Sequence, residues 1–203
     1  GMVEANGQWY IFYHRQTNRH SYSRQACAEP LERRADGDFC QAEVTSCGLN
    51  GGPLKGSGQY PARIACNLWS GKGTARYDIR FPRFRLSAHP YFTQEGKDGE
   101  ERDSQYIANM RDGAVAGFKY FAFASLKSLS VQVRGRANGA LLVSDTPDFE
   151  APAARIEIKL SGEGWKELGA PCAIPDGTRP LYFKFTGKGR LDFRAFTLTG
   201  GAL

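Results

Sequence analysis

Residues 181–198 (LYFKFTGKGRLDFRAFTL) constrain the fold more than any other part of the chain. Large apolar side chains alternate with polar ones before the segment Gly187-Lys188-Gly189, and the alternation resumes after it. Period-two alternation is typical of half-buried β-strands, and a glycine-containing segment between two such runs is typical of a hairpin turn. We therefore predict a β-hairpin whose aromatic face is covered by a second sheet.

Strand-like runs follow one another at short spacing through the second half of the chain. They lie at residues 106–110, 115–121, 128–134, 140–144, 155–160, 166–170 and 181–198. The chain also has 24 glycines and few helix-favouring runs, which is typical of β-proteins with many tight turns. We predict an all-β chain whose second half is a jelly-roll β-sandwich.

The first residues predict a β-hairpin of their own. Asn6-Gly7 is a turn signal, residues 8–14 form a strongly aromatic strand, and residues 20–28 are its expected partner, with no earlier strand beside them. Because an isolated hairpin is marginally stable in water, it must pack on something. We expect its exposed aromatic edge to pair with the sandwich or with a second copy in a homodimer.

The composition of the chain changes between residues 70 and 90, after which the strand signals come regularly. We place the domain boundary in this region. Residues 1–75 are then the N-terminal β segment with its connection, and residues 76–203 are the sandwich.

Charge and hydropathy exclude several classes of partner. The net charge is +6, but lysine and arginine are scattered among acidic residues, which is typical of a solvated surface. No nucleic-acid-binding motif is present, and no run of eighteen apolar residues could span a membrane. The start of the chain shows no export signal. We expect a cytoplasmic protein if Met2 is the native start, and otherwise a secreted or periplasmic one that is part of a longer enzyme.

The five cysteines are Cys27, Cys40, Cys47, Cys66 and Cys172. Their number is odd and no pair has CxxC spacing, so the pattern does not indicate a zinc site. We expect free thiols, with one disulfide among the first four cysteines as the open alternative.

Few residues have the pattern of a catalytic or metal centre. His14 and His20 flank the first turn, but two histidines without a matching carboxylate are too few for a metal site. The acidic residues lie in polar loops, and no GxSxG motif is present. Trp165, in SGEGWKEL, lies on an expected loop, where its indole is either an exposed platform for a sugar ring or a core side chain beneath that loop.

Several segments resemble two known families. NGQWYIFYHRQTNRHSYSRQACAEPLE resembles the last blade of the five-bladed propeller of family 43 glycoside hydrolases, enzymes that remove arabinose or xylose from plant polysaccharides. YIANMRDGAVAGFKYFAF, SLSVQVRG, GEGWKEL and LYFKFTGKGRLDFRAFTL resemble a family 6 carbohydrate-binding module, a jelly roll that often follows the propeller. The resemblance implies a propeller-derived β-hairpin segment joined to a sandwich.

The propeller resemblance assigns a role to a histidine. In the family, a histidine of the last blade points to the propeller axis, and His20 matches it best, with His14 as the alternative. The family's three catalytic acids lie in earlier blades, which have no counterpart in this chain. Because an inverting hydrolase needs its acid and its base on opposite sides of the scissile bond, this chain alone is not expected to hydrolyse glycosides.

The module resemblance implies a set of ligand contacts. Trp165 matches the residue that stacks on the sugar, and Arg190 and Tyr106 complete the implied ligand-binding set. Ala114 stands where a second aromatic residue is expected, and Arg190 stands where an asparagine is common. The family also often holds a structural calcium ion, for which Asp192 is the matching ligand and Glu95 or Gln94 the candidates near the module's start.

The sequence therefore predicts a non-catalytic, carbohydrate-binding portion of a family 43-like glycosidase that acts on plant arabinoxylan or a similar polysaccharide. Two alternatives stay open. The chain could complete the propeller active site of an arabinofuranosidase or xylosidase supplied by another polypeptide. It could also be a structural buttress that binds no sugar, for which the alanine at position 114 is the argument.

Overall fold

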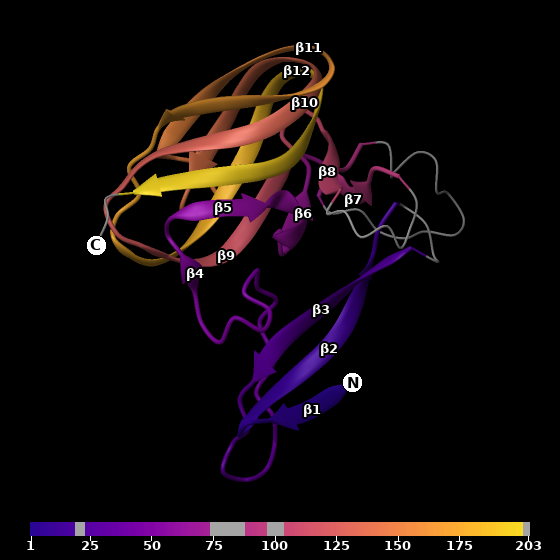
Figure 1. Ribbon diagram of the computed structural model, residues 1–203, viewed down its shortest axis with the longest axis vertical. Coiled ribbons are helices and arrows are strands. Elements are labelled where there is room, and N and C mark those ends of the chain that lie inside the picture. The colour runs from indigo at the N-terminus through magenta and orange to yellow at the C-terminus, as the bar shows by residue number, and fades with distance from the viewer. Residues whose placement is uncertain (19–22, 74–87, 97–103, 201–203) are drawn as a thin grey trace.

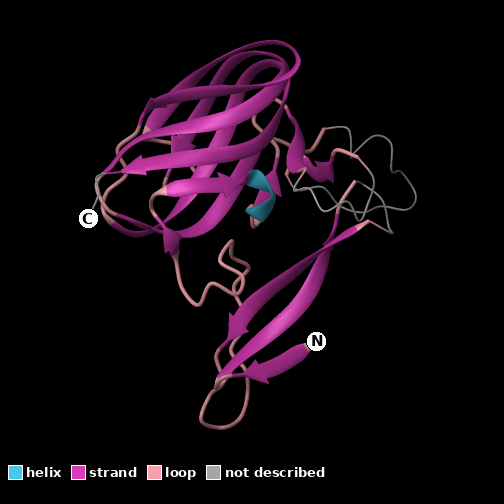
Figure 2. Ribbon diagram, in the orientation of Figure 1, coloured by secondary structure: helices cyan, strands magenta, loops and turns pink. Residues whose placement is uncertain are grey.

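The computed structural model describes residues 1–18, 23–73, 88–96 and 104–200. Figures 1 and 2 show an almost entirely β molecule, in which a small N-terminal sheet lies beside a larger β-sandwich. Within the described residues the only helical element is a single 3-10 turn, η1 (Ala62–Ile64). The predicted all-β fold class is confirmed.

The small sheet has three antiparallel strands in the order β1-β2-β3. They are β1 (Met2–Ala5), β2 (Gln8–Gln16) and β3 (Arg24–Leu31). Asn6 and Gly7 join β1 to β2 with φ values of 53° and 77°, the conformation of a tight two-residue hairpin turn. The expectation that the hairpin has no earlier partner is wrong, because β1 pairs along β2 from Met2 to Ala5.

The larger sheet has nine strands, with β11-β10-β12-β8-β7 as its main path. Its strands are β4 (Leu54–Lys55), β5 (Gly58–Pro61), β6 (Asn67–Trp69), β7 (Tyr91–Gln94), β8 (Gln105–Met110), β9 (Val115–Phe123), β10 (Leu126–Ser144), β11 (Ala154–Pro171) and β12 (Gly177–Gly200). The first half of β12 pairs with β9, and its second half pairs with β8 and β5. Because β10 accompanies β12 along its length, both strands pass from one layer of the sandwich to the other (Figure 1).

The predicted hairpin at residues 181–198 is wrong in its connectivity. These residues belong to the single strand β12, which pairs with β10 on both sides of Gly187 and Gly189. A Cβ atom at Gly187 would lie 2.4 Å from the carbonyl oxygen of Asn138, and one at Gly189 would lie 2.1 Å from that of Arg136. The glycines therefore allow two backbones to approach closely where the strands bend, and they do not reverse the chain.

Two other strands also run through glycine-containing segments that were expected to separate shorter strands. Residues 128–134 and 140–144 are both part of β10, and residues 155–160 and 166–170 are both part of β11. The polar, glycine-containing segments between them continue as paired strand, and the pairing of β10 with β11 has one register shift, between Val133 and Gly135.

The aromatic face of β12 is buried as predicted. Phe183, Phe193 and Phe196 have no more than 1% of their surface exposed, and their rings pack on one another and on Phe118 of β9. Tyr182 lies on the opposite face of the strand, where the alternation places the polar residues, and it is also buried, at 6% exposure, in a small second cluster.

The small sheet packs on the sandwich through Arg15 of β2. Its guanidinium donates hydrogen bonds to the backbone carbonyls of Ala65 and Arg63 and lies 3.7 Å from the centroid of the Phe92 ring. The backbone N–H of Asn18 adds a bond of 2.7 Å to the carbonyl of Phe92. The hairpin therefore packs on the sandwich, but in the described residues its strands pair with one another and not with a strand of the larger sheet, so the expected pairing of its edge with the sandwich is wrong.

The predicted division into 1–75 and 76–203 stays a prediction. The strand pairing nevertheless places β4, β5 and β6, which lie before residue 75, in the larger sheet, where they pair with β9 and β12. The small three-stranded sheet ends at Leu31.

All five cysteines are free thiols, so the alternative of one disulfide is wrong. Cys172 is buried, and burial raises the pKa of its thiol to about 11. The other four are half-buried. In the part of the chain that the structure describes, no helix is long and apolar enough to cross a membrane.

Candidate functional site

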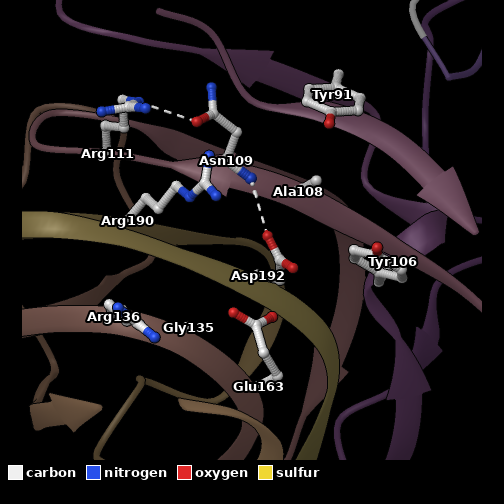
Figure 3. Close-up of a pocket in the computed structure, with 10 residues that line it drawn as sticks. All are labelled: Tyr91, Tyr106, Ala108, Asn109, Arg111, Gly135, Arg136, Glu163, Arg190 and Asp192. Carbon is white, nitrogen blue, oxygen red and sulfur yellow. Dashed lines mark hydrogen bonds between the residues drawn. The ribbon is translucent and has the colours of Figure 1, made fainter. Parts of the chain in front are cut away.

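A cavity of about 390 Å³ opens where β12, β8, β10 and β11 lie side by side. Figure 3 shows its lining: Tyr91, Tyr106, Ala108, Asn109, Arg111, Gly135, Arg136, Glu163, Arg190 and Asp192. Along β12 the lining residues Arg190 and Asp192 alternate with Leu191 and Phe193, which are fully buried. The cavity therefore uses the polar face of the strand whose other face forms the core.

A bulge in β8 shapes the rim of this cavity. Leu191 pairs with Met110 and Phe193 with Ile107, so two residues of β8 stand opposite one of β12, and Asn109 in the bulge has a φ of 63°. Bulges redirect backbone and side-chain groups beside binding sites. Here the bulge aims the backbone N–H of Asn109 at Oδ1 of Asp192, at 3.1 Å.

The side chain of Asn109 links two neighbouring segments. Its Nδ2 donates to the backbone carbonyl of His89 at 3.0 Å, and its Oδ1 accepts from Nε of Arg111 at 2.9 Å (Figure 3). Asn109 is 6% exposed. Asn109 therefore has a fixed position and holds Arg111 at the rim of the cavity.

The guanidinium of Arg134 binds two acidic side chains beside the cavity. Arg134 donates from Nε to Oδ2 of Asp192 at 3.2 Å, and from Nη1 to Oε1 of Glu95. Asp192 thus accepts one bond from Arg134 and one from the backbone N–H of Asn109. The carboxylate has a fixed position, since both of its oxygens are held.

Trp165 lies in β11 and is half-buried, so its expected position on an exposed loop is wrong. Its ring meets that of Tyr106 at 5.4 Å in an edge-on arrangement. The guanidinium carbons of Arg134 and Arg194 lie over the indole at 4.3 and 5.6 Å from the ring centroid. Trp165 stands behind Tyr106 and does not line the cavity, so it supports the tyrosine ring there.

Tyr106 is the aromatic residue that links this stack to the cavity. Burial raises the pKa of its hydroxyl above the usual value. A tyrosine hydroxyl is protonated at neutral pH and can donate a hydrogen bond. Tyr91 on β7 supplies a second ring to the lining.

The calcium site implied by the family resemblance does not fit the described residues. Asp192 and Glu95 both bind the guanidinium of Arg134, which supplies positive charge where the ion would be needed. In the described ranges, no three histidine, cysteine, aspartate or glutamate residues gather as a metal site. Gln94 is half-buried at the end of β7 and does not line the cavity.

Of the two histidines implied at the propeller axis, the structure describes His14, which does not line the cavity. His14 is an exposed residue of β2, opposite Ala26. His20 falls outside the described residues. Ala114, where the resemblance implies a second aromatic residue, is fully buried in the core and could not carry a ligand-binding ring without moving.

The structure thus brings Tyr106, Arg190 and Asp192 of the predicted site into one cavity and leaves Trp165 behind Tyr106. Sequence reasoning missed the remaining polar lining: Tyr91, Asn109, Arg111, Arg136 and Glu163. The sequence carried no distinguishing signal for Arg136 and Glu163, because a polar segment with glycines inside a strand looks the same as a turn between two strands.

Comparison with curated proteins finds a xylosidase/arabinosidase of Thermoclostridium stercorarium that is 44% identical over 197 residues, which are 97% of this chain and 41% of that protein. Among solved structures, a family 43 arabinoxylan arabinofuranohydrolase from Bacillus subtilis in complex with cellotetraose matches 98% of this chain and 40% of its own length, with a TM-score of 0.63 and 17% identity. The resemblance to part of a family 43 glycoside hydrolase is confirmed. No family model matches the chain.

Two isolated modules share the fold of the family 6-like sandwich. A β-1,3-glucan-binding family 6 module from Bacillus halodurans matches over its whole length and 73% of this chain, with a TM-score of 0.57 and 14% identity. A family 6 module from Clostridium stercorarium, solved with cellobiose, matches over 99% of its length and 74% of this chain, with a TM-score of 0.55 and 12% identity. At these identities the likeness establishes the fold of the sandwich.

Proposed function

We propose that the chain is a non-catalytic, saccharide-binding portion of a family 43-like glycosidase that acts on plant arabinoxylan or a similar polysaccharide, and that the cavity of Figure 3 holds the saccharide. The observation that carries the proposal is the composition of the cavity lining. Two tyrosine rings offer apolar surface to a sugar face, while the exposed carboxylate of Glu163 and the hydroxyl of Tyr106 offer hydrogen-bonding groups to its hydroxyls.

Calorimetric titration with neutral xylo- and arabino-oligosaccharides tests this proposal, with Tyr106→Ala as the diagnostic variant. We expect the wild-type chain to bind, and the variant to bind about tenfold more weakly or worse, because it loses a stacking surface and a hydroxyl donor worth about 1–2 kcal/mol together. The matched control is Tyr10→Ala on the small sheet, far from the cavity, which should bind like the wild type.

Absence of heat with every oligosaccharide would remove the proposal and favour the structural buttress. If Tyr106→Ala binds as tightly as the wild type, the cavity is not the site, even where the chain binds sugar.

A second candidate function rests on the small sheet. One face of the small sheet carries Val3, Tyr10, Phe12 and His14. Val3 stands opposite Tyr10 in the register of β1 and β2, and alternate residues of β2 lie on the same face as Tyr10. Val3 is 45% and Phe12 41% exposed. The chain spans only 41% of the xylosidase/arabinosidase relative, so the remaining part of such a protein is the partner that this face would meet.

Co-expression with a polypeptide corresponding to the rest of that relative tests the second candidate. We expect a stable complex with arabinofuranosidase or xylosidase activity, and loss of both with Phe12→Glu, because a charge would be buried in an apolar contact. Thr178→Glu, at an exposed position of β12 in the sandwich, is the control and should change neither. Failure to form a complex with the unmodified chain would exclude this function.

A further inference from the structure

Three arginines line one end of the cavity. Arg111 follows β8, Arg136 is in β10 and Arg190 is in β12, and all three are exposed. Arg136 and Arg190 stand directly opposite each other in the register of the two strands. Like charges at directly opposed positions destabilise a sheet, so this pair costs stability in the absence of a counter-charge.

The nearby carboxylates do not supply that counter-charge. Asp192 is already held by Arg134 and by the N–H of Asn109. In the described part of the chain, no ion pair joins Arg111, Arg136 or Arg190 to an acidic side chain. Arg111 bonds to the neutral amide oxygen of Asn109.

The cavity therefore has two chemically different ends. In Figure 3 the arginines lie on the left, and Tyr91 and Tyr106 lie on the right. The tyrosine end suits the uncharged face of a sugar ring, whereas the arginine end suits an anion. Guanidinium groups present paired N–H donors that match the two oxygens of a carboxylate.

We propose that the preferred ligand is an acidic saccharide, whose uronic acid carboxylate is bound by Arg136 and Arg190 with Arg111 beside them. This inference rests on the proposed saccharide-binding function and narrows its ligand class. A sulfate ester on a sugar offers similar charge and acceptor oxygens, so the experiment includes it as the other source of the anion. The cavity volume of about 390 Å³ is within the range of small-molecule sites.

The test is a calorimetric titration of the full chain with four probes of equal backbone length. They are a neutral xylo-oligosaccharide, the same oligomer bearing one glucuronic acid group, the methyl ester of that acid, and a sulfated form. We expect the glucuronic acid form to bind about tenfold more tightly than the neutral oligomer and its methyl ester, because hydrogen bonds between ionised partners are stronger than neutral ones. The preference should fall as salt is added.

The double variant Arg136→Gln/Arg190→Gln should bind all four probes about equally, because the groups that distinguish an anionic probe from a neutral one are gone. Lys159→Gln removes a positive charge from an exposed position of β11 outside the cavity, and it should retain the preference. Because the two arginines are exposed and mutually repulsive, the double variant is expected to fold, and a thermal melt checks that its midpoint is not lowered.

Each outcome decides one claim. Equal binding of the neutral and glucuronic acid probes overturns the acidic ligand class and leaves the saccharide-binding function standing. A preference for the sulfated probe alone overturns the uronic acid assignment. A preference that survives in the double variant overturns the role of the two arginines. No binding of any probe removes the underlying function as well.

Discussion

Replacing Gly189 with alanine is expected to destabilise the chain by about 3 kcal/mol or more, or to prevent folding. Gly189 has a φ of 88°, which costs an alanine about 1 kcal/mol. A Cβ atom there would also lie 2.1 Å from the carbonyl oxygen of Arg136 and 3.0 Å from Cα of Ala137. Since both contacts are with backbone atoms, the two central strands must separate to relieve them, at a further cost of about 1–3 kcal/mol.

Urea unfolding monitored by tryptophan fluorescence measures this change. Gly162→Ala is the matched control in β11, because a Cβ atom there meets nothing within 4 Å, and its free energy of unfolding should stay the same or rise slightly. If residues 187–189 were a hairpin turn, Gly189→Ala would cost only about 1 kcal/mol. A loss that small would contradict the continuous strand.

Phe118→Ala is expected to lower the free energy of unfolding by about 3–5 kcal/mol. Phe118 is fully buried, and its ring lies 5.7 Å from Phe183, 6.3 Å from Phe193 and 4.8 Å from Phe196. Its removal leaves a cavity at the point where β9 meets β12, and the rings around it are held by two different halves of the same strand. Little relaxation into that space is therefore available.

The comparison for Phe118→Ala is Phe12→Ala in the small sheet, where 41% of the side chain is exposed and the expected loss is below about 1 kcal/mol. Chemical unfolding of both variants measures the loss, and the slope of each transition is compared with that of the wild type. A loss for Phe118→Ala no larger than that for Phe12→Ala would show that the aromatic cluster is not the stabilising core.

The alternation in β12 predicted its buried face because that signal is local. Phe183 and Phe193 lie where their spacing puts them, and the requirement for a covering sheet follows from their size. The meaning of Gly187 and Gly189 is not local. A glycine at a turn and a glycine where two backbones meet have the same sequence signature, and only the pairing with β10, far earlier in the chain, distinguishes them.

The residues of the candidate site that were predicted are those that the family resemblance identified. Tyr106, Arg190 and Asp192 were identified in this way and line one cavity. Arg136 and Glu163 could not be assigned, since each was expected outside a strand and the cavity exists only because strands distant in sequence lie side by side. Trp165 was identified as functional, but the guanidinium groups over its ring come from β10 and β12, which its own segment does not reveal.

The passage of β10 and β12 through both layers also determines how the sandwich can come apart. In a sandwich whose layers are built from separate strands, one layer can open while the other persists. Here, melting one layer withdraws hydrogen-bond partners from the same two strands in the other. The sandwich therefore behaves as one cooperative unit, with little scope for partly opened states between the native and unfolded ensembles.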